Sequence, residues 1–81
     1  MSKVKLGDWR WYLGTDEQDD EMMDCGTREH AIADGRRQFK KGQPFYIVEA
    51  RMRVSDEKAM ERGEADSALF EESRNGEWIT A

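Results

Sequence analysis

The sequence predicts a small α+β domain of two layers, in which one main helix packs against a mostly antiparallel sheet of two or three strands. Residues 9–13 and 45–54 alternate between apolar and polar side chains with the period of a β-strand. Residues 28–41, between them, carry apolar side chains at helical spacing, and this order favours a helix layered on a sheet. A chain of 81 residues has room for one domain, which would span residues 1–81.

The first expected strand, residues 9–13, places Trp9 and Trp11 on the same face of the sheet. Large aromatic rings bury much apolar surface, so we expect both to belong to the core. The acidic run that follows, residues 16–21, has the composition of an exposed turn. Residues 21–25 would then return as a second strand and close a hairpin, although their alternation is poor.

The main helix is expected at residues 28–41. Thr27 is suited to the N-cap position, because a threonine hydroxyl can accept a hydrogen bond from a backbone amide of the first turn. Cations fill the last turns, where the helix dipole favours positive charge, namely Arg36, Arg37, Lys40 and Lys41. Gly42 and Pro44 would end the helix.

The strand at residues 45–54 is apolar throughout on one face, which carries Tyr46, Val48, Ala50 and Met52. The other face begins apolar and becomes charged. Such a strand is buried on both faces at its start and half-exposed at its end. We therefore expect it in the centre of the sheet, with the helix over its apolar face.

Two short helices are expected after this strand, at residues 56–62 and 66–74. Asn75-Gly76 would end the second of them. Trp78 would fold back onto the core in a short strand or a docked tail, or lie exposed as part of an interface.

The net charge of −5 is unevenly distributed along the chain. Residues 1–26 carry three basic and seven acidic side chains, residues 27–54 seven basic and three acidic, and residues 55–81 three basic and eight acidic. A basic middle thus lies between two acidic ends. The simplest explanation is charge complementarity within the molecule, combined with solubility.

The densest acidic group is expected to bind a protein partner. It comprises Asp16, Glu17, Asp19, Asp20, Glu21 and Asp24. An acidic surface of this kind can occupy a basic nucleic-acid-binding groove on another protein, because complementary charge speeds association. The alternative is that these residues serve solubility alone.

A second candidate site is a basic patch that would bind phosphates, made of Arg36, Arg37, Lys40, Lys41, Arg51 and Arg53. The simpler interpretation is a solvated helix face with cations near its end, and the overall acidity disfavours approach to nucleic acid. A homodimer is a further alternative, because a chain of this length buries only a small core by itself.

Catalysis is not expected. Cys25 and His30 are the only cysteine and histidine, and Cys25 precedes a helix N-terminus, an environment that lowers a thiol pKa. No third residue that would orient the pair is evident, so we expect a small buried cysteine at a turn and a solvent-facing histidine. One His and one Cys are too few for a zinc site, the acidic run lacks the glycine and final Glu of an EF-hand, and no glycine-rich phosphate cradle occurs. We therefore expect no metal and no cofactor.

A cytoplasmic location is expected, because a single cysteine cannot form an intramolecular disulfide and so fits a reducing compartment. Residues 1–6 contain no apolar run of signal-peptide length. No segment approaches the roughly 20 apolar residues that cross a membrane, so no membrane contact is expected.

The stretches WRWYLGTDE, GTREHAIADGRRQF and PFYIVEARM, between Trp9 and Met52, resemble small acidic proteins encoded by bacteriophages and prophages. The resemblance rests on a cap, a short helix and a strand, and it carries no catalytic or binding residues over. It implies that the protein acts in a host cytoplasm by binding and disabling a host enzyme or defence complex, as anti-CRISPR proteins do. A structural role in a phage particle is an alternative.

Overall fold

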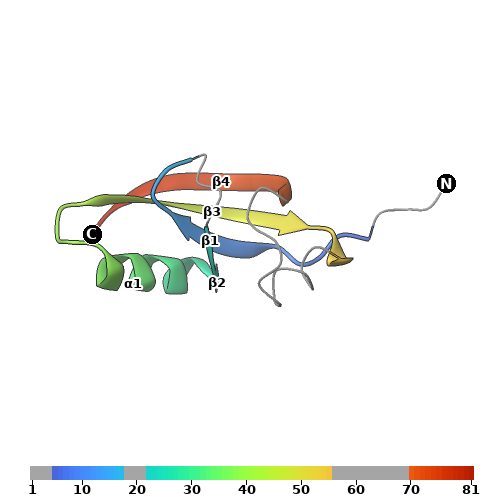
Figure 1. Cartoon of the computed structure of the whole chain (residues 1–81), viewed down its shortest axis with the longest axis horizontal. Helices are drawn as coiled ribbons and strands as arrows, with labels where there is room; N and C mark the ends of the chain where they lie inside the picture. Colours follow the sequence, from blue (N-terminus) through green and yellow to red (C-terminus); the bar gives the residue numbers. More distant parts are fainter. Residues whose placement is uncertain (1–4, 18–21, 56–69) are drawn as a thin grey trace.

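The computed structural model describes residues 5–17, 22–55 and 70–81, and in them a four-stranded antiparallel sheet carries helix α1 on one face (Figure 1). The elements are β1 Arg10–Gly14, β2 Met23–Gly26, α1 Arg28–Gln38, β3 Pro44–Met52 and β4 Phe70–Thr80. The strand order is β2-β1-β3-β4. The predicted helix on an antiparallel sheet is therefore observed, with one strand more than the largest number predicted. Within the described residues, no helix has the length and apolar character needed to span a membrane.

The hairpin predicted from residues 9–13 and 21–25 is confirmed. Leu13 pairs with Met23, and Tyr12 with Asp24. Strand β1 is paired along both edges, and its side chains Tyr12 and Leu13 enter different core clusters, so that Tyr12 retains only 2% of its exposure. Tyr12 is therefore a core residue.

Helix α1 begins as predicted but ends earlier. The Thr27 hydroxyl accepts a hydrogen bond from the His30 amide at 3.2 Å, as expected of an N-cap. At the other end Phe39 adopts an extended backbone, and its ring stacks on Phe45 with the centroids 5.7 Å apart. Because the core takes up the Phe39 ring, Lys40 lies beyond the helix, which the sequence had extended to residue 41.

The helix covers the face of β3 opposite to the predicted one. Ala31 of α1 belongs to the same buried cluster as Phe45 and Ile47. The second cluster lies on the other face and contains Tyr12, Met22, Val48, Ala50 and Met52. The Phe45 face is apolar only over the first half of β3, and a helix of 11 residues, about 16 Å long, matches that half.

The C-terminal region differs most from the prediction. Residues 70–74, expected in a helix, belong to β4, so this part of the prediction is wrong. The expected helix at 56–62 and residues 66–69 lie outside the described residues. The expectation that Trp78 returns in a strand is confirmed, but that strand is 11 residues long.

Asn75 and Gly76, expected to stop a helix, form a bulge within β4. Ile47 pairs with Glu77 and Glu49 with Arg74, so both bulge residues lie opposite the single residue between them on β3. Asn75 has a φ of 56°, the left-handed conformation that asparagine tolerates better than most residues.

Ion pairs join the polar half of β3 to β4. Arg74 Nε lies 2.7 Å from Glu49 Oε1, and these residues are direct cross-strand partners. Arg51 Nη2 lies 2.9 Å from Glu72 Oε1 in the next rung of the same face. Opposite charges across an antiparallel pair stabilise it modestly. These contacts join residues more than 20 positions apart. They stabilise residues 70–74 as part of a strand, although the local composition of that segment had indicated a helix.

A substitution at Gly35 tests how closely α1 packs on β3. A Cβ at this position would lie 2.3 Å from Phe45 Cε2, so we expect Gly35→Ala to destabilise the protein by about 1–3 kcal/mol through overpacking. Helix propensity alone would give a gain of about 1 kcal/mol, so the sign is informative. Urea unfolding of Gly35→Ala, Phe45→Leu and the double variant measures the coupling. Equal costs of the alanine in both backgrounds would contradict contact with the Phe45 ring.

The Glu49 carboxylate should make the stability of the fold depend on pH in the acid range. Hydrogen bonds from Arg74 and then Asn75 hold the pKa of the Glu49 carboxyl below its ordinary 4.5. A group whose pKa is lowered by folding stabilises above its unfolded pKa and loses that contribution as pH falls through the folded value. We expect the free energy of unfolding to decrease below about pH 4.5, and to decrease less in Glu49→Gln. Parallel curves for the two proteins between pH 5 and pH 3 would contradict this role.

Candidate functional site

Trp78, on the edge strand β4, has 48% of its surface exposed. Tyr46 is its cross-strand partner on β3, with the two ring centroids 5.4 Å apart and the planes tilted by 57°. Glu17, just after β1, accepts a hydrogen bond from the indole Nε1 at 3.3 Å. We call Trp78, Tyr46 and Glu17 the aromatic corner.

The sheet register builds this corner. Gly14 pairs with Tyr46, and Tyr46 with Trp78, so one rung of three strands ends beside the turn that carries Glu17. A Cβ on Gly76 would lie 1.7 Å from the Tyr46 hydroxyl, so only glycine leaves room for the phenol against β4. The pKa of Tyr46 is raised, first by burial and then by the negative charge of Glu17.

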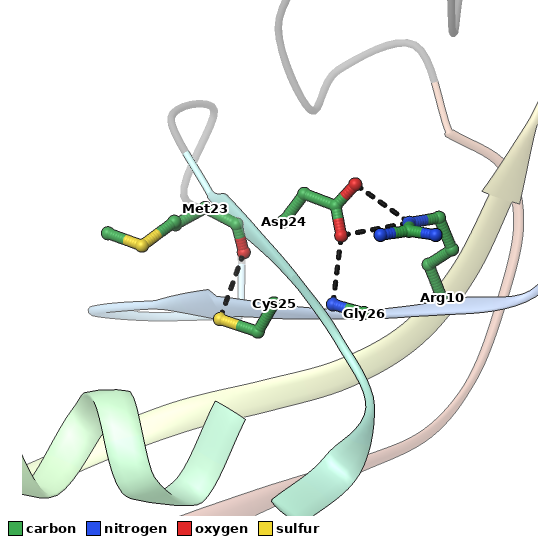
Figure 2. A network of polar contacts seen from close by, with 5 residues as sticks. All are labelled: Arg10, Met23, Asp24, Cys25 and Gly26. Atoms are coloured by element: carbon green, nitrogen blue, oxygen red, sulfur yellow. Dashed lines mark hydrogen bonds and ion pairs between the residues drawn. The ribbon is translucent and has the colours of Figure 1, made fainter. Parts of the chain in front are cut away.

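The acidic residues predicted to bind a partner are only partly described. Asp16 and Glu17 are exposed in the turn after β1, at the same end of the sheet as Trp78. The Asp24 carboxylate accepts hydrogen bonds from Arg10 Nε at 2.8 and 3.0 Å and from the Gly26 amide at 2.9 Å (Figure 2). Asp24 therefore has a role in holding β2 against β1. The other three, Asp19, Asp20 and Glu21, lie outside the described residues.

The acidic residues of β4 are engaged within the molecule. Glu77 accepts hydrogen bonds from Arg28 of α1 at 2.8 and 3.1 Å, which lowers the Glu77 pKa. Glu71 and Glu72 pair with Arg53 and Arg51. The basic middle and acidic end of the sequence are therefore complementary charges across the sheet.

The six cations of the predicted basic patch lie in two groups. Arg36 and Arg37 occupy the last turn of α1, followed closely by Lys40 and Lys41, near the start of β3. Arg51 lies near the opposite end of that strand, about 23 Å from its start at 3.3 Å per residue, and Arg53 follows just beyond it. Both are ion-paired, as is Arg37 with Asp34. The fold thus separates the set.

Trp9 is a half-buried platform for two arginines. The guanidinium carbons of Arg74 and Arg51 lie 3.8 and 4.8 Å from the centroid of its ring, and Arg74 is also held by Glu49. Trp11 is half-buried and packs against the cluster under α1. Trp11 therefore borders the core, as predicted, whereas Trp9 belongs to neither core cluster of the described residues and packs against arginines instead.

Cys25 is a small buried residue, as the sequence favoured. Its thiol is 9% exposed and donates a weak hydrogen bond to the Met23 carbonyl at 3.6 Å (Figure 2). The pKa of Cys25 is raised to about 12, first by burial and then by the nearby Asp34 and Asp24 carboxylates. The helix N-terminus does not overcome these effects, so the thiol stays protonated at neutral pH, while His30 is exposed. No group of three or more potential metal ligands occurs among the described residues.

The sequence singled out two members of the aromatic corner, Glu17 and Trp78, but did not predict that they are in contact. Glu17 belonged to the acidic run and Trp78 was considered as an interface residue, but 61 positions separate them. The alternation of β3 pointed to Tyr46 only as an apolar strand residue. Pairing of β4 with β3 brings the three together. Comparison with protein-family models, curated proteins and solved structures found no match to this chain.

Cys25 should react very slowly in the folded protein. A thiol pKa of about 12 instead of 9.0 reduces the thiolate fraction at pH 8 by about three orders of magnitude, and only the thiolate reacts. We expect iodoacetamide labelling, followed by mass spectrometry, to be at least 100-fold slower in buffer than in 8 M urea. Labelling at similar rates in both would contradict the buried, protonated thiol.

Proposed function

We propose that the protein is a non-catalytic interaction protein that binds and inhibits a basic host protein or complex. The exposed indole of Trp78 beside the Glu17 carboxylate carries this proposal. A nucleic-acid-handling host enzyme, such as a CRISPR effector, is the type of target that the resemblance to phage proteins suggests. Blocking that enzyme's basic groove would be the mechanism.

An exposed tryptophan next to acids suits an interface. Tryptophan is enriched among the few residues that dominate binding energy, because its large ring is rigid and amphipathic. Trp78 sits on the outermost strand of the described sheet, where a partner can reach it. Asp16 and Glu17 add negative charge at the same end, which would steer a basic partner toward the ring.

The engagement of the tail acids focuses the proposal on this end. Glu71, Glu72 and Glu77 already neutralise arginines of the same molecule. In the acidic run Asp24 is likewise paired, with Arg10, whereas the exposed Glu17 carboxylate is held to the indole of Trp78. Phosphate binding is less well supported, since the basic residues lie in two groups that are partly paired with acids.

Loss of the indole should abolish most of the binding. Affinity capture from host lysate, with proteins identified by mass spectrometry, should yield a partner with the wild type and lose it with Trp78→Ala. For the purified partner we expect Trp78→Ala to weaken binding about 30-fold or more, as for a hot-spot residue of 2 kcal/mol. Association should also slow several-fold between 50 and 500 mM salt.

Gln38→Ala, an exposed change on α1, is the matched control and should bind like the wild type. Circular dichroism should show that both variants are folded. A partner captured equally by the wild type and Trp78→Ala would refute the proposed surface, and an affinity and association rate independent of salt would refute its electrostatic part.

A further inference from the structure

The chain contains its own example of how a tryptophan and a carboxylate together hold an arginine. At Trp9 the guanidinium carbon of Arg74 lies 3.8 Å from the ring centroid, while Arg74 Nε donates to Glu49 Oε1 at 2.7 Å. The ring face attracts the cation through its quadrupole, and the carboxylate supplies a charge-assisted hydrogen bond. The two interactions fix the position and the plane of the guanidinium.

The aromatic corner contains the same parts in a more open setting. The Glu17 carboxylate lies at the indole edge of Trp78, 3.3 Å from Nε1, and Tyr46 packs against the indole from β3. Among the described residues, the two arginines that stack on a tryptophan ring, Arg51 and Arg74, both stack on Trp9 and not on Trp78. A carboxylate has about four acceptor positions, so one bond from the indole leaves Glu17 able to accept more.

We infer that the aromatic corner binds an arginine side chain of the partner, with the guanidinium over the exposed indole of Trp78 and hydrogen-bonded to the Glu17 carboxylate. This inference rests on the proposed function and names the chemistry that the site recognises. The pKa of Tyr46 is raised first by burial and then by the negative charge of Glu17, and the exposed carboxylate 3.3 Å from the indole favours a cationic occupant. Arginine is favoured over lysine because a planar guanidinium stacks on indole and offers several donors to one carboxylate.

The probe is N-acetyl-arginine-N-methylamide, titrated into the ¹⁵N-labelled full chain at constant ionic strength. The three indole Nε1–H signals are observed by NMR, and Trp78→Phe assigns the one from the corner. We expect the Trp78 signal to shift and saturate in the millimolar range, as befits a single side chain. The Trp9 and Trp11 signals should move much less.

Two comparisons isolate the cation and the carboxylate. N-acetyl-citrulline-N-methylamide has nearly the same shape without the charge and should bind at least tenfold more weakly. Glu17→Gln should weaken binding of the arginine probe about tenfold, as expected for a lost charge-assisted hydrogen bond. Glu29→Gln removes the same charge from the exposed surface of α1 and should leave the affinity unchanged.

Each remaining outcome counts against the inference. A Trp78 signal that does not shift, an equal affinity for the citrulline probe, or an unaltered affinity in Glu17→Gln would overturn it. If the partner is still lost with Trp78→Ala while the arginine probe fails, the partner binds the corner by another chemistry and only this inference is wrong. If the probe binds but Trp78→Ala keeps the partner, the proposed function is wrong instead.

Discussion

The fold depends on the burial of β3 from both sides. This strand pairs with β1 along one edge and with β4 along the other. Its side chains alternate between two separate hydrophobic clusters, one on each face of the sheet. Phe45 and Ile47 are fully buried beneath α1, while Ala50 is fully buried on the opposite face. A chain with only 37% hydrophobic residues thereby forms a core on both faces of one sheet. Doubly covered strands make the best use of few apolar side chains.

The position of the aromatic corner follows from the same strand. Tyr46 is held between Gly14 and Trp78, both of them direct partners of it in neighbouring strands. Gly76 leaves space for the Tyr46 phenol, because a Cβ at this position would collide with its hydroxyl. The rigid part of the molecule therefore presents Trp78 in a fixed place, and pre-organised side chains lose little entropy when they bind.

The sequence predicted those features that local patterns determine. The cap at Thr27, the strand that begins near residue 45 and the hairpin of β1 and β2 all have short-range signals, and all are present. Strand β4 has no such signal, because six of its first seven residues are polar or glycine. Its identity comes from cross-strand pairs such as Glu49–Arg74, which involve residues 25 positions apart. The choice of face for α1 was equally non-local, since it depends on the length of the helix and on where Phe39 turns inward.

The contacts at the candidate site are also non-local. The sequence identified a dense acidic run and an isolated tryptophan, but their contact exists only because β4 is a strand. It favoured a buried Cys25 but did not show that Asp34 would lie beside the thiol, where burial and then Asp34 raise the thiol pKa. Electrostatic effects of neighbours distant in sequence are the information that a linear pattern lacks.

The bulge in β4 has a consequence for the molecule in crowded solution. A long outer strand is a template on which another chain can polymerise, because its backbone amides and carbonyls are regularly spaced. The left-handed Asn75 and the extra residue beside it break that spacing near the middle of the strand. The charged side chains that flank the break, Glu72 and Arg74 among them, make a dry sheet-to-sheet contact costly. The kink therefore protects the chain from fibrous self-assembly while leaving the residues beyond it, Trp78 included, in regular strand geometry.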